Sequence, residues 1–215
     1  METLVKPKSV SELFGLPTPP TTGRERLVAA GIDLFSRHGF QAVGLDSVIE
    51  HAGVTKTTFY KHFDGKDDLV LACLETRDAW EMQAWDRAAR SLAGDDPRAQ
   101  LLALFDILDT WFNDKDFRGC LFINAAAEFS DRRDPLHQAA AAHKRKARDH
   151  FRALAARAGA ADPDAFADQF TLLFEGTLVL RHAHDRDDAV AVVLPSLVRL
   201  VDEHIPLSDT PGVRS

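Results

Sequence analysis

Apolar side chains recur three and four residues apart along most of this chain, and this spacing is the feature that most limits its fold. Leu27, Ala30, Gly31, Leu34 and Phe35 follow one face of an α-helix. Similar spacing returns after the glycines and prolines that interrupt it, and no strand pattern of convincing length occurs. The sequence therefore predicts an all-α fold of about nine helices.

Three of the later helices have clear starting points, because an aspartate precedes a proline at each. The sequences are GDDP (94–97), RRDP (132–135) and ADP (161–163). At a helix start the aspartate carboxylate satisfies free backbone amides, and the N–H that proline lacks would have had no helical partner. The pattern predicts one helix beginning at each of these three prolines.

Composition excludes several classes of protein. The chain has 215 residues, 45% of them hydrophobic and 27% charged, which is enough to bury a sizeable core. Its net charge of -7 means that any contact with DNA needs a local basic surface. Two cysteines without a CxxC pair, and no charged-then-apolar leader, favour a cytoplasmic protein. No apolar run approaches the roughly 18 residues that span a bilayer, so no membrane partner is expected.

The segment GVTKTTFYKHF (53–63) concentrates threonine and positive charge in this acidic chain. A short helical pattern at 45–52 precedes it, and Phe59 and Phe63 within it lie one helical turn apart. Two short helices joined by a tight turn, after one packing helix, form a helix-turn-helix, whose second helix enters the major groove of DNA. The alternative is an ordinary amphipathic helix with a solvated basic face.

The side of this second helix away from the phenylalanines carries groups suited to DNA. Threonine can meet phosphates, base edges or the thymine methyl group, and lysine and tyrosine reach phosphate oxygens. A lysine at the start of the following helix adds a cation beside free backbone amides. The candidate DNA-binding residues are Thr55, Lys56, Thr57, Thr58, Tyr60, Lys61, His62 and Lys66.

The stretch AAGIDLFSRHGFQAVGLDSVIEHAGVTKTTFYKHFDGKDDLVLACL (29–74) resembles, in order and spacing, the DNA-binding pattern of the TetR family, the tetracycline-repressor-like regulators of bacteria. The resemblance implies an all-α homodimer with an N-terminal DNA-binding domain and a C-terminal domain for dimerisation and ligand binding. It places base contacts on Lys56, Thr57 and Thr58, and the phosphate contacts on the other candidates.

Four positions depart from the family pattern. Val43 and Gly44 stand where many relatives carry a pair of threonines that cap the first helix of the motif. Asp46 stands where a basic residue is common, and Thr57 where glycine is frequent. We expect a weaker cap and a different operator preference.

The expected domains follow from these patterns. Residues 1–22 hold four of the ten prolines and no helical period longer than a turn, which favours a flexible arm. A helix-turn-helix domain is expected at 23–66, an effector-binding and dimerisation domain at 67–206, and a flexible tail at 207–215.

The C-terminal half resembles one branch of the family, with a GCL motif, through RGCLFINAAAEFSD (118–131) and FEGTLVLRHAH (174–184). The resemblance implies that the last two helices form a four-helix bundle with their symmetry mates, in agreement with their broadly apolar circumference. The expected interface residues are Phe170, Phe174, Leu178, Leu194, Leu197 and Val201. The alternative is that these side chains form the core of one protomer.

An effector pocket is expected among the middle helices. Its candidate residues are Trp111, Phe112, Cys120, Phe122, Phe129, His143 and His150. These aromatic and histidine side chains can instead be core residues. Two histidines seven residues apart are too distant to chelate one ion unaided, so neither a metal nor a cofactor is expected.

These observations predict a DNA-binding regulator of transcription, and the resemblance favours a repressor. Its expected partners are double-stranded operator DNA bound as a homodimer, by one dimer or two, and a partly apolar effector that releases it. One alternative is a helical protein-interaction adaptor that has lost DNA binding. Another is a regulator that senses oxidants or electrophiles through Cys120, although a small buried residue also explains this cysteine. No catalytic constellation or phosphate-binding loop is visible, so an enzyme is not expected.

Overall fold

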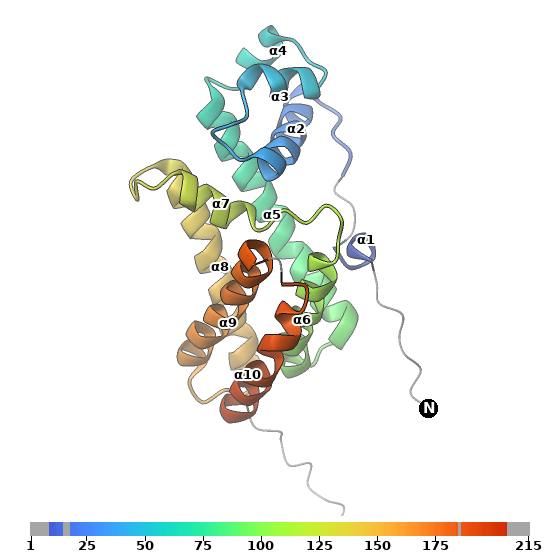
Figure 1. Ribbon diagram of the computed structural model, residues 1–215, viewed down its shortest axis with the longest axis vertical. Helices are drawn as coiled ribbons and strands as arrows, with labels where there is room; N and C mark the ends of the chain where they lie inside the picture. The colour runs from blue at the N-terminus through green and yellow to red at the C-terminus, as the bar shows by residue number, and fades with distance from the viewer. Residues whose placement is uncertain (1–8, 15–17, 185, 206–215) are drawn as a thin grey trace, which may run out of the picture. The chain divides into compact units, whose positions relative to one another are not determined.

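The computed structural model describes residues 9–14, 18–184 and 186–205, which form α-helices joined by turns (Figure 1). No strand occurs in these ranges, and the all-α prediction is confirmed. In chain order the helices are α1 (Val10–Phe14), α2 (Gly23–His38), α3 (Leu45–His51), α4 (Lys56–Tyr60), α5 (Lys66–Ala93), α6 (Pro97–Phe112), α7 (Leu121–Glu128), α8 (Pro135–Arg157), α9 (Pro163–His184) and α10 (Ala189–His204).

Helix α1 lies within the segment expected to be a flexible arm. Phe14, at its end, is only 4% exposed, and its ring centroid lies 6.1 Å from that of Trp80 and 5.2 Å from that of Trp85 on α5. The expectation of an unstructured arm is therefore wrong for this part, because a five-residue helix is too short to show a period. The first eight residues and the predicted tail at 207–215 lie outside the described ranges.

The helix starts follow the predicted capping chemistry. Asp96 accepts hydrogen bonds from the backbone N–H groups of Arg98 and Ala99 at 2.9 and 3.3 Å. The starts of α8 and α9 are capped in the same way by Asp134 and Asp162, as predicted. These three caps confirm that each Asp-Pro pair begins a helix.

The chain forms two compact units. The N-terminal unit contains Ser9–Asp86 and Asp114–Lys146, and the C-terminal unit contains Arg87–Asn113 and the described residues from Ala147 onward. Helices α5 and α8 each contribute to both units. This division follows the packing of the chain and differs from the predicted border after residue 66. The predicted border separates DNA binding from effector binding and dimerisation, and it remains a proposal.

Aromatic rings from α6, α8 and α9 form the core of the C-terminal unit. The ring centroid of Phe105 lies 5.4 Å from that of Phe170 and 5.6 Å from that of Phe174, and Phe151 lies 4.7 Å from Phe170. Helix α10 also packs on α6 and α9. The faces of α9 and α10 that turn toward α6 and α8 are thus covered within one chain.

This packing corrects the predicted dimer interface. Five of the six predicted residues are at most 7% exposed in the single chain, namely Phe170, Phe174, Leu178, Leu197 and Val201. They are core residues of the protomer, because α6, α8 and α10 cover the faces expected to meet a second chain. Leu194 is 45% exposed. The other large apolar side chains exposed on these two helices are Leu172, Val179, Val192 and Val198.

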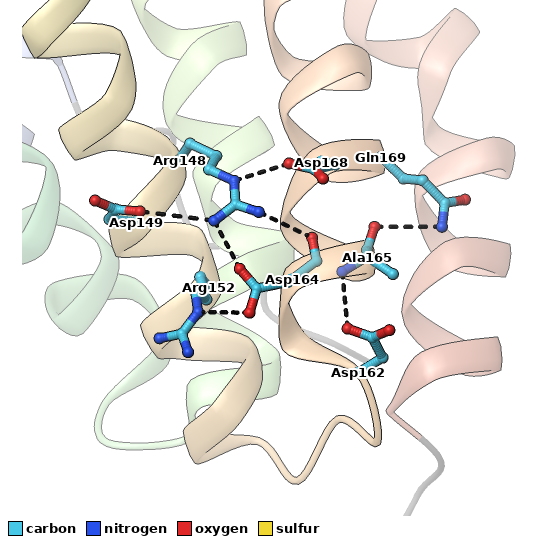
Figure 2. A network of polar contacts seen from close by, with 8 residues as sticks. All are labelled: Arg148, Asp149, Arg152, Asp162, Asp164, Ala165, Asp168 and Gln169. Carbon is cyan, nitrogen blue, oxygen red and sulfur yellow. Dashed lines mark hydrogen bonds and ion pairs between the residues drawn. The ribbon is translucent and has the colours of Figure 1, made fainter.

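A polar network joins α8 to α9 on the surface of the C-terminal unit (Figure 2). Arg148 donates from Nε to Asp168 and from Nη1 to Asp164, both at 2.8 Å. Arg152 Nε donates to the other carboxylate oxygen of Asp164 at 2.9 Å. Hydrogen bonds from Arg152 and then Arg148 lower the pKa of Asp164. The network fixes the start of α9 against the second half of α8.

Within the described ranges, no helix is both long enough and apolar enough to cross a membrane.

Candidate DNA-binding site

Helices α3 and α4 form a helix-turn-helix that packs on α2 (Figure 1). The turn between them depends on Gly53, whose φ of 62° lies in the left-handed region that favours glycine. Its N–H donates to the carbonyl of Glu50 at 3.0 Å, and the N–H of Val54 donates to that of Ile49 at 3.2 Å. These bonds end α3 and direct the chain into α4.

Helix α4 is oriented by a cap at its start and by two phenylalanines. Thr55 Oγ1 accepts the backbone N–H of Thr58 at 3.1 Å and caps the helix. Phe59 is fully buried and Phe63 is 3% exposed, with ring centroids 5.6 Å apart. The apolar side of α4 therefore faces α2 and α3, and its opposite side faces outward.

The predicted DNA-binding residues lie on and beside that outward side. Thr55, Lys56, Thr57, Tyr60, Lys61 and His62 are exposed, and Thr58 and Lys66 are partly exposed. Tyr60 is 61% exposed, so this large aromatic side chain is not part of the core. The helix itself is shorter than predicted, ending at Tyr60, so Lys61 and His62 lie in the turn that follows.

Two of the lysines make contacts that the sequence analysis did not anticipate. Lys56 Nζ lies 2.9 Å from Oδ1 of Asp46, in the first turn of α3, and this hydrogen-bonded ion pair raises the pKa of Lys56. Lys66 Nζ donates to the carbonyl of Gln41 at 3.4 Å. An ammonium has three donors, so either lysine can make these contacts and still meet a phosphate.

Arg24, in the first turn of α2, is a cation beside the recognition helix that the sequence analysis missed. Its guanidinium carbon lies 5.2 Å from the ring centroid of Phe63, and the side chain is exposed. A basic residue at the start of a helix, where free amides already favour anions, was the signal that could have identified it. Arg24 extends the cationic surface of α4 onto α2.

Four of the predicted effector residues lie in the N-terminal unit. Phe122 on α7 stacks on His143 of α8, with ring centroids 3.5 Å apart, and His143 Nδ1 lies 2.8 Å from Asp78 Oδ1 on α5. Burial lowers the pKa of His143, although Glu81 and Asp78 oppose this shift. Phe129 instead packs against Phe40, 5.6 Å between centroids. Phe129 is thus placed beside the end of α2.

The other three predicted effector residues belong to the C-terminal unit. Phe112 is 1% exposed and lies 6.4 Å from Trp111 between ring centroids, and His150 lies on the second half of α8. A cavity of about 460 Å³ occurs elsewhere, between residues 18–21, α2 and α5, beside Val28, Ile32 and Trp80. None of the predicted effector residues lines this cavity.

Both cysteines are buried free thiols. Burial raises the pKa of the Cys73 thiol to about 12, and its Sγ lies 3.5 Å from the carbonyl oxygen of Val28. Cys73 is therefore an unreactive core residue. Cys120 is 6% exposed at the N-cap of α7.

Known proteins share these features. A family model described as bacterial regulatory proteins, tetR family, matches residues 27–73. A second, described as the tetracyclin repressor-like C-terminal domain, matches residues 97–197. The transcriptional regulator AcuR of Cereibacter sphaeroides is 29% identical over 194 residues, which are 80% of this chain and 87% of that protein.

Two further relatives extend the comparison. The transcriptional repressor NemR of Escherichia coli is 30% identical over 117 residues, which are 54% of this chain and 58% of that protein. The solved structure of a TetR-family transcriptional regulator from Streptomyces coelicolor matches with a TM-score of 0.77 and 30% identity, over 85% of this chain and 95% of that one. The match includes both the helix-turn-helix and the C-terminal helices, and the chain belongs to the TetR family of DNA-binding transcriptional regulators.

Proposed function

We propose that this regulator is a repressor that binds a near-palindromic operator as a homodimer through α4 and is released by a small-molecule effector. The observation that carries the proposal is the division of α4 into two sides. Phe59 and Phe63 are buried, whereas Lys56, Thr57 and Tyr60 are exposed. The relative NemR is named a repressor, which supports this direction of control. Such a regulator acts in the cytoplasm, where the operator lies.

The proposed dimer surface combines exposed apolar side chains of α9 and α10. Leu172 is 74% exposed, and Leu194 and Val198 are 45% and 39% exposed one helical turn apart on α10. Apolar side chains gathered on two helices of one unit are a typical protein interface. TetR-family regulators usually act as dimers, which agrees with this assignment.

The proposed effector is partly apolar and acts near the start of α7. Phe122 and His143 are 1% and 6% exposed and combine apolar packing with an imidazole that Asp78 already orients, so an effector would reach them by displacing α7. Direct sensing through Cys120 is disfavoured, because a thiol that is 6% exposed is poorly accessible to an oxidant in solution. An effector that displaces α7 would leave the recognition helices in an unsuitable position for the operator.

Fluorescence anisotropy tests the proposal with labelled DNA from beside the protein's own gene and with sites selected from random sequence. Saturable binding that weakens steeply between 50 and 200 mM salt is expected, at roughly the slope of several phosphate contacts. Lys56→Ala and Tyr60→Phe should weaken it, whereas Arg157→Ala, an exposed cation in the last turn of α8, should not. Absence of any saturable complex would favour the protein-interaction adaptor instead.

A further inference from the structure

The last residue of α7 contacts the turn that leads into the helix-turn-helix. The carboxylate of Glu128 accepts the backbone N–H of Phe40 at 2.9 Å with one oxygen and that of Gln41 at 2.7 Å with the other. These two amides lie in the turn that leads from α2 into α3. One carboxylate thus holds two consecutive amides of a segment 87 and 88 residues away in the chain.

The turn itself is built to receive this carboxylate. Gly39 has a φ of 82°, and a Cβ added there would lie 2.9 Å from Oε1 of Glu128. The ring of Phe40 is fully buried, with its centroid 5.3 Å from that of Phe35 and 5.6 Å from that of Phe129, the neighbour of Glu128. The approach of α7 to this turn is therefore close, and it combines apolar packing with two charge-assisted hydrogen bonds.

Helix α3 has no side-chain cap of its own. Its N-cap is Gly44, which makes no side-chain hydrogen bond, whereas α2 and α4 are capped by Thr22 and Thr55. The start of α3 consequently depends on what holds the preceding turn. Lys66 binds the carbonyl of Gln41, and Glu128 binds the N–H of the same residue. The contacts of Lys66 and Glu128 with Gln41 therefore order the turn before α3, a role that a side-chain cap at the start of the helix would otherwise have.

The other end of α7 packs on buried titratable groups. Phe122 stacks on His143, which is 6% exposed, and His143 pairs with Asp78. Lys146 forms an ion pair with the same carboxylate. Helix α7 is therefore anchored at both ends, at its start on α5 and α8 and at its end on the turn before α3.

We propose that Glu128 is a positioning residue for DNA recognition, which holds the turn before α3 so that the position of α7 determines the order and orientation of the helix-turn-helix. This inference rests on the operator binding proposed above and adds a specific carboxylate to it. Glu128 itself contacts no DNA. It acts through the amides of Phe40 and Gln41, and through them on α3 and α4.

The test compares Glu128→Ala and Glu128→Gln with Asp131→Asn in the full-length protein. Asp131 is a matched control, because it lies three residues further along and its side chain bonds only to Arg133 among the described residues. Hydrogen exchange at the Phe40 and Gln41 amides is measured first. Operator affinity by anisotropy is measured second, at one salt concentration.

Glu128→Ala is expected to accelerate exchange at both amides, to leave α5 and α8 protected, and to weaken operator binding roughly fivefold or more, the lower range of coupling between distant sites. Glu128→Gln should fall between parent and alanine variant. Asp131→Asn should match the parent in amide exchange and bind operator at least as tightly, because it also loses one negative charge but leaves the turn intact. Removal of a negative charge alone would strengthen DNA binding, so a weaker complex cannot arise from charge.

Two results overturn the inference. Unchanged exchange at Phe40 and Gln41 in Glu128→Ala would show that the contact does not order the turn. Accelerated exchange with unchanged operator affinity would show that the contact is structural only. If the parent protein itself binds no operator, the proposed function fails and this inference fails with it, and the affinity of the parent separates that case from the other two.

Discussion

The ammonium group of Lys56 forms an ion pair with Asp46 in the free protein, and operator DNA would compete with Asp46 for it. Both side chains are well exposed, at 66% for Lys56 and 74% for Asp46. Exposed ion pairs contribute little to stability and exchange readily for a phosphate or a base. We therefore expect Asp46 to affect DNA affinity mainly through its charge and its ion pair with Lys56.

Asp46→Asn is predicted to strengthen operator binding, roughly two- to fivefold, the range expected when an exposed ion pair is removed. The variant removes a negative charge from the first turn of α3, beside the proposed DNA-binding surface, and frees Lys56. Anisotropy titrations of parent and variant on one operator measure the effect, with Asp131→Asn as the charge-matched control. A variant that binds more weakly than the parent would show that Asp46 orders the site instead of restraining it.

At the residue scale the sequence predicted which side chains point outward but not which of them are paired. Burial of Phe59 and Phe63 follows from helical spacing, and the exposure of Lys56 and Tyr60 follows with it. The Lys56–Asp46 pair joins two helices across a turn, and Glu128 reaches Phe40 from a distant segment. Neither contact has a periodic signature, because each depends on the tertiary fold.

Among the elements, α8 and α9 are joined by a network whose strength depends on pH. Arg152 and Arg148 lower the pKa of Asp164 by hydrogen bonding to its carboxylate. The depressed pKa stabilises the folded state at pH values above the ordinary pKa of aspartate, about 4. This contribution decreases as the pH falls through the lower pKa of the folded state.

Asp164→Asn is predicted to lower the melting temperature at neutral pH by a small amount, because the network is exposed to solvent. The difference between parent and variant should shrink as the pH falls below about 4, the ordinary pKa of aspartate, and should vanish once the pH is below the lowered pKa of Asp164 in the folded parent. Circular dichroism melts across this pH range measure both quantities. A difference that grows at low pH would contradict the assignment.

Prediction of the elements succeeded where capping chemistry marks a boundary. Asp96, Asp134 and Asp162 begin their helices as expected, since the Asp-Pro pair is a local signal. The short helix α1 was missed, because its order comes from Phe14 packing on Trp80 and Trp85. The last turn of α4 was overextended for a similar reason, since apolar spacing continues through Phe63 after the helix ends.

For the whole molecule, the central expectation is a dimer that places two copies of α4 on one face of DNA. Apolar pattern alone did not distinguish protomer core from interface. Phe170 and Leu172 are close in the sequence of α9, yet the first is fully buried and the second is 74% exposed. The packing of α6, α8 and α10 against α9 determines which of these side chains is buried in the protomer and which stays exposed.

The double variant Leu194→Glu with Val198→Glu is predicted to convert the dimer into monomers and to keep the helical content. Both side chains are exposed on α10, so the single chain should still fold, but two carboxylates cannot be buried at an interface without partners. Sedimentation velocity over a concentration series measures the change. Glu203→Gln, an exposed change on the same helix, is the control, and a variant that stays dimeric would place the interface elsewhere.

Operator affinity as a function of the spacing between half-sites tests directly whether a dimer binds DNA through two copies of α4. A dimer that presents two α4 helices requires half-sites about one helical turn apart, roughly 34–36 Å. Insertion of about half a turn of DNA between them should therefore reduce the affinity to that of a single half-site, and insertion of a full turn should restore only part of it. Affinity that is independent of the spacing would contradict a dimer that binds through paired recognition helices.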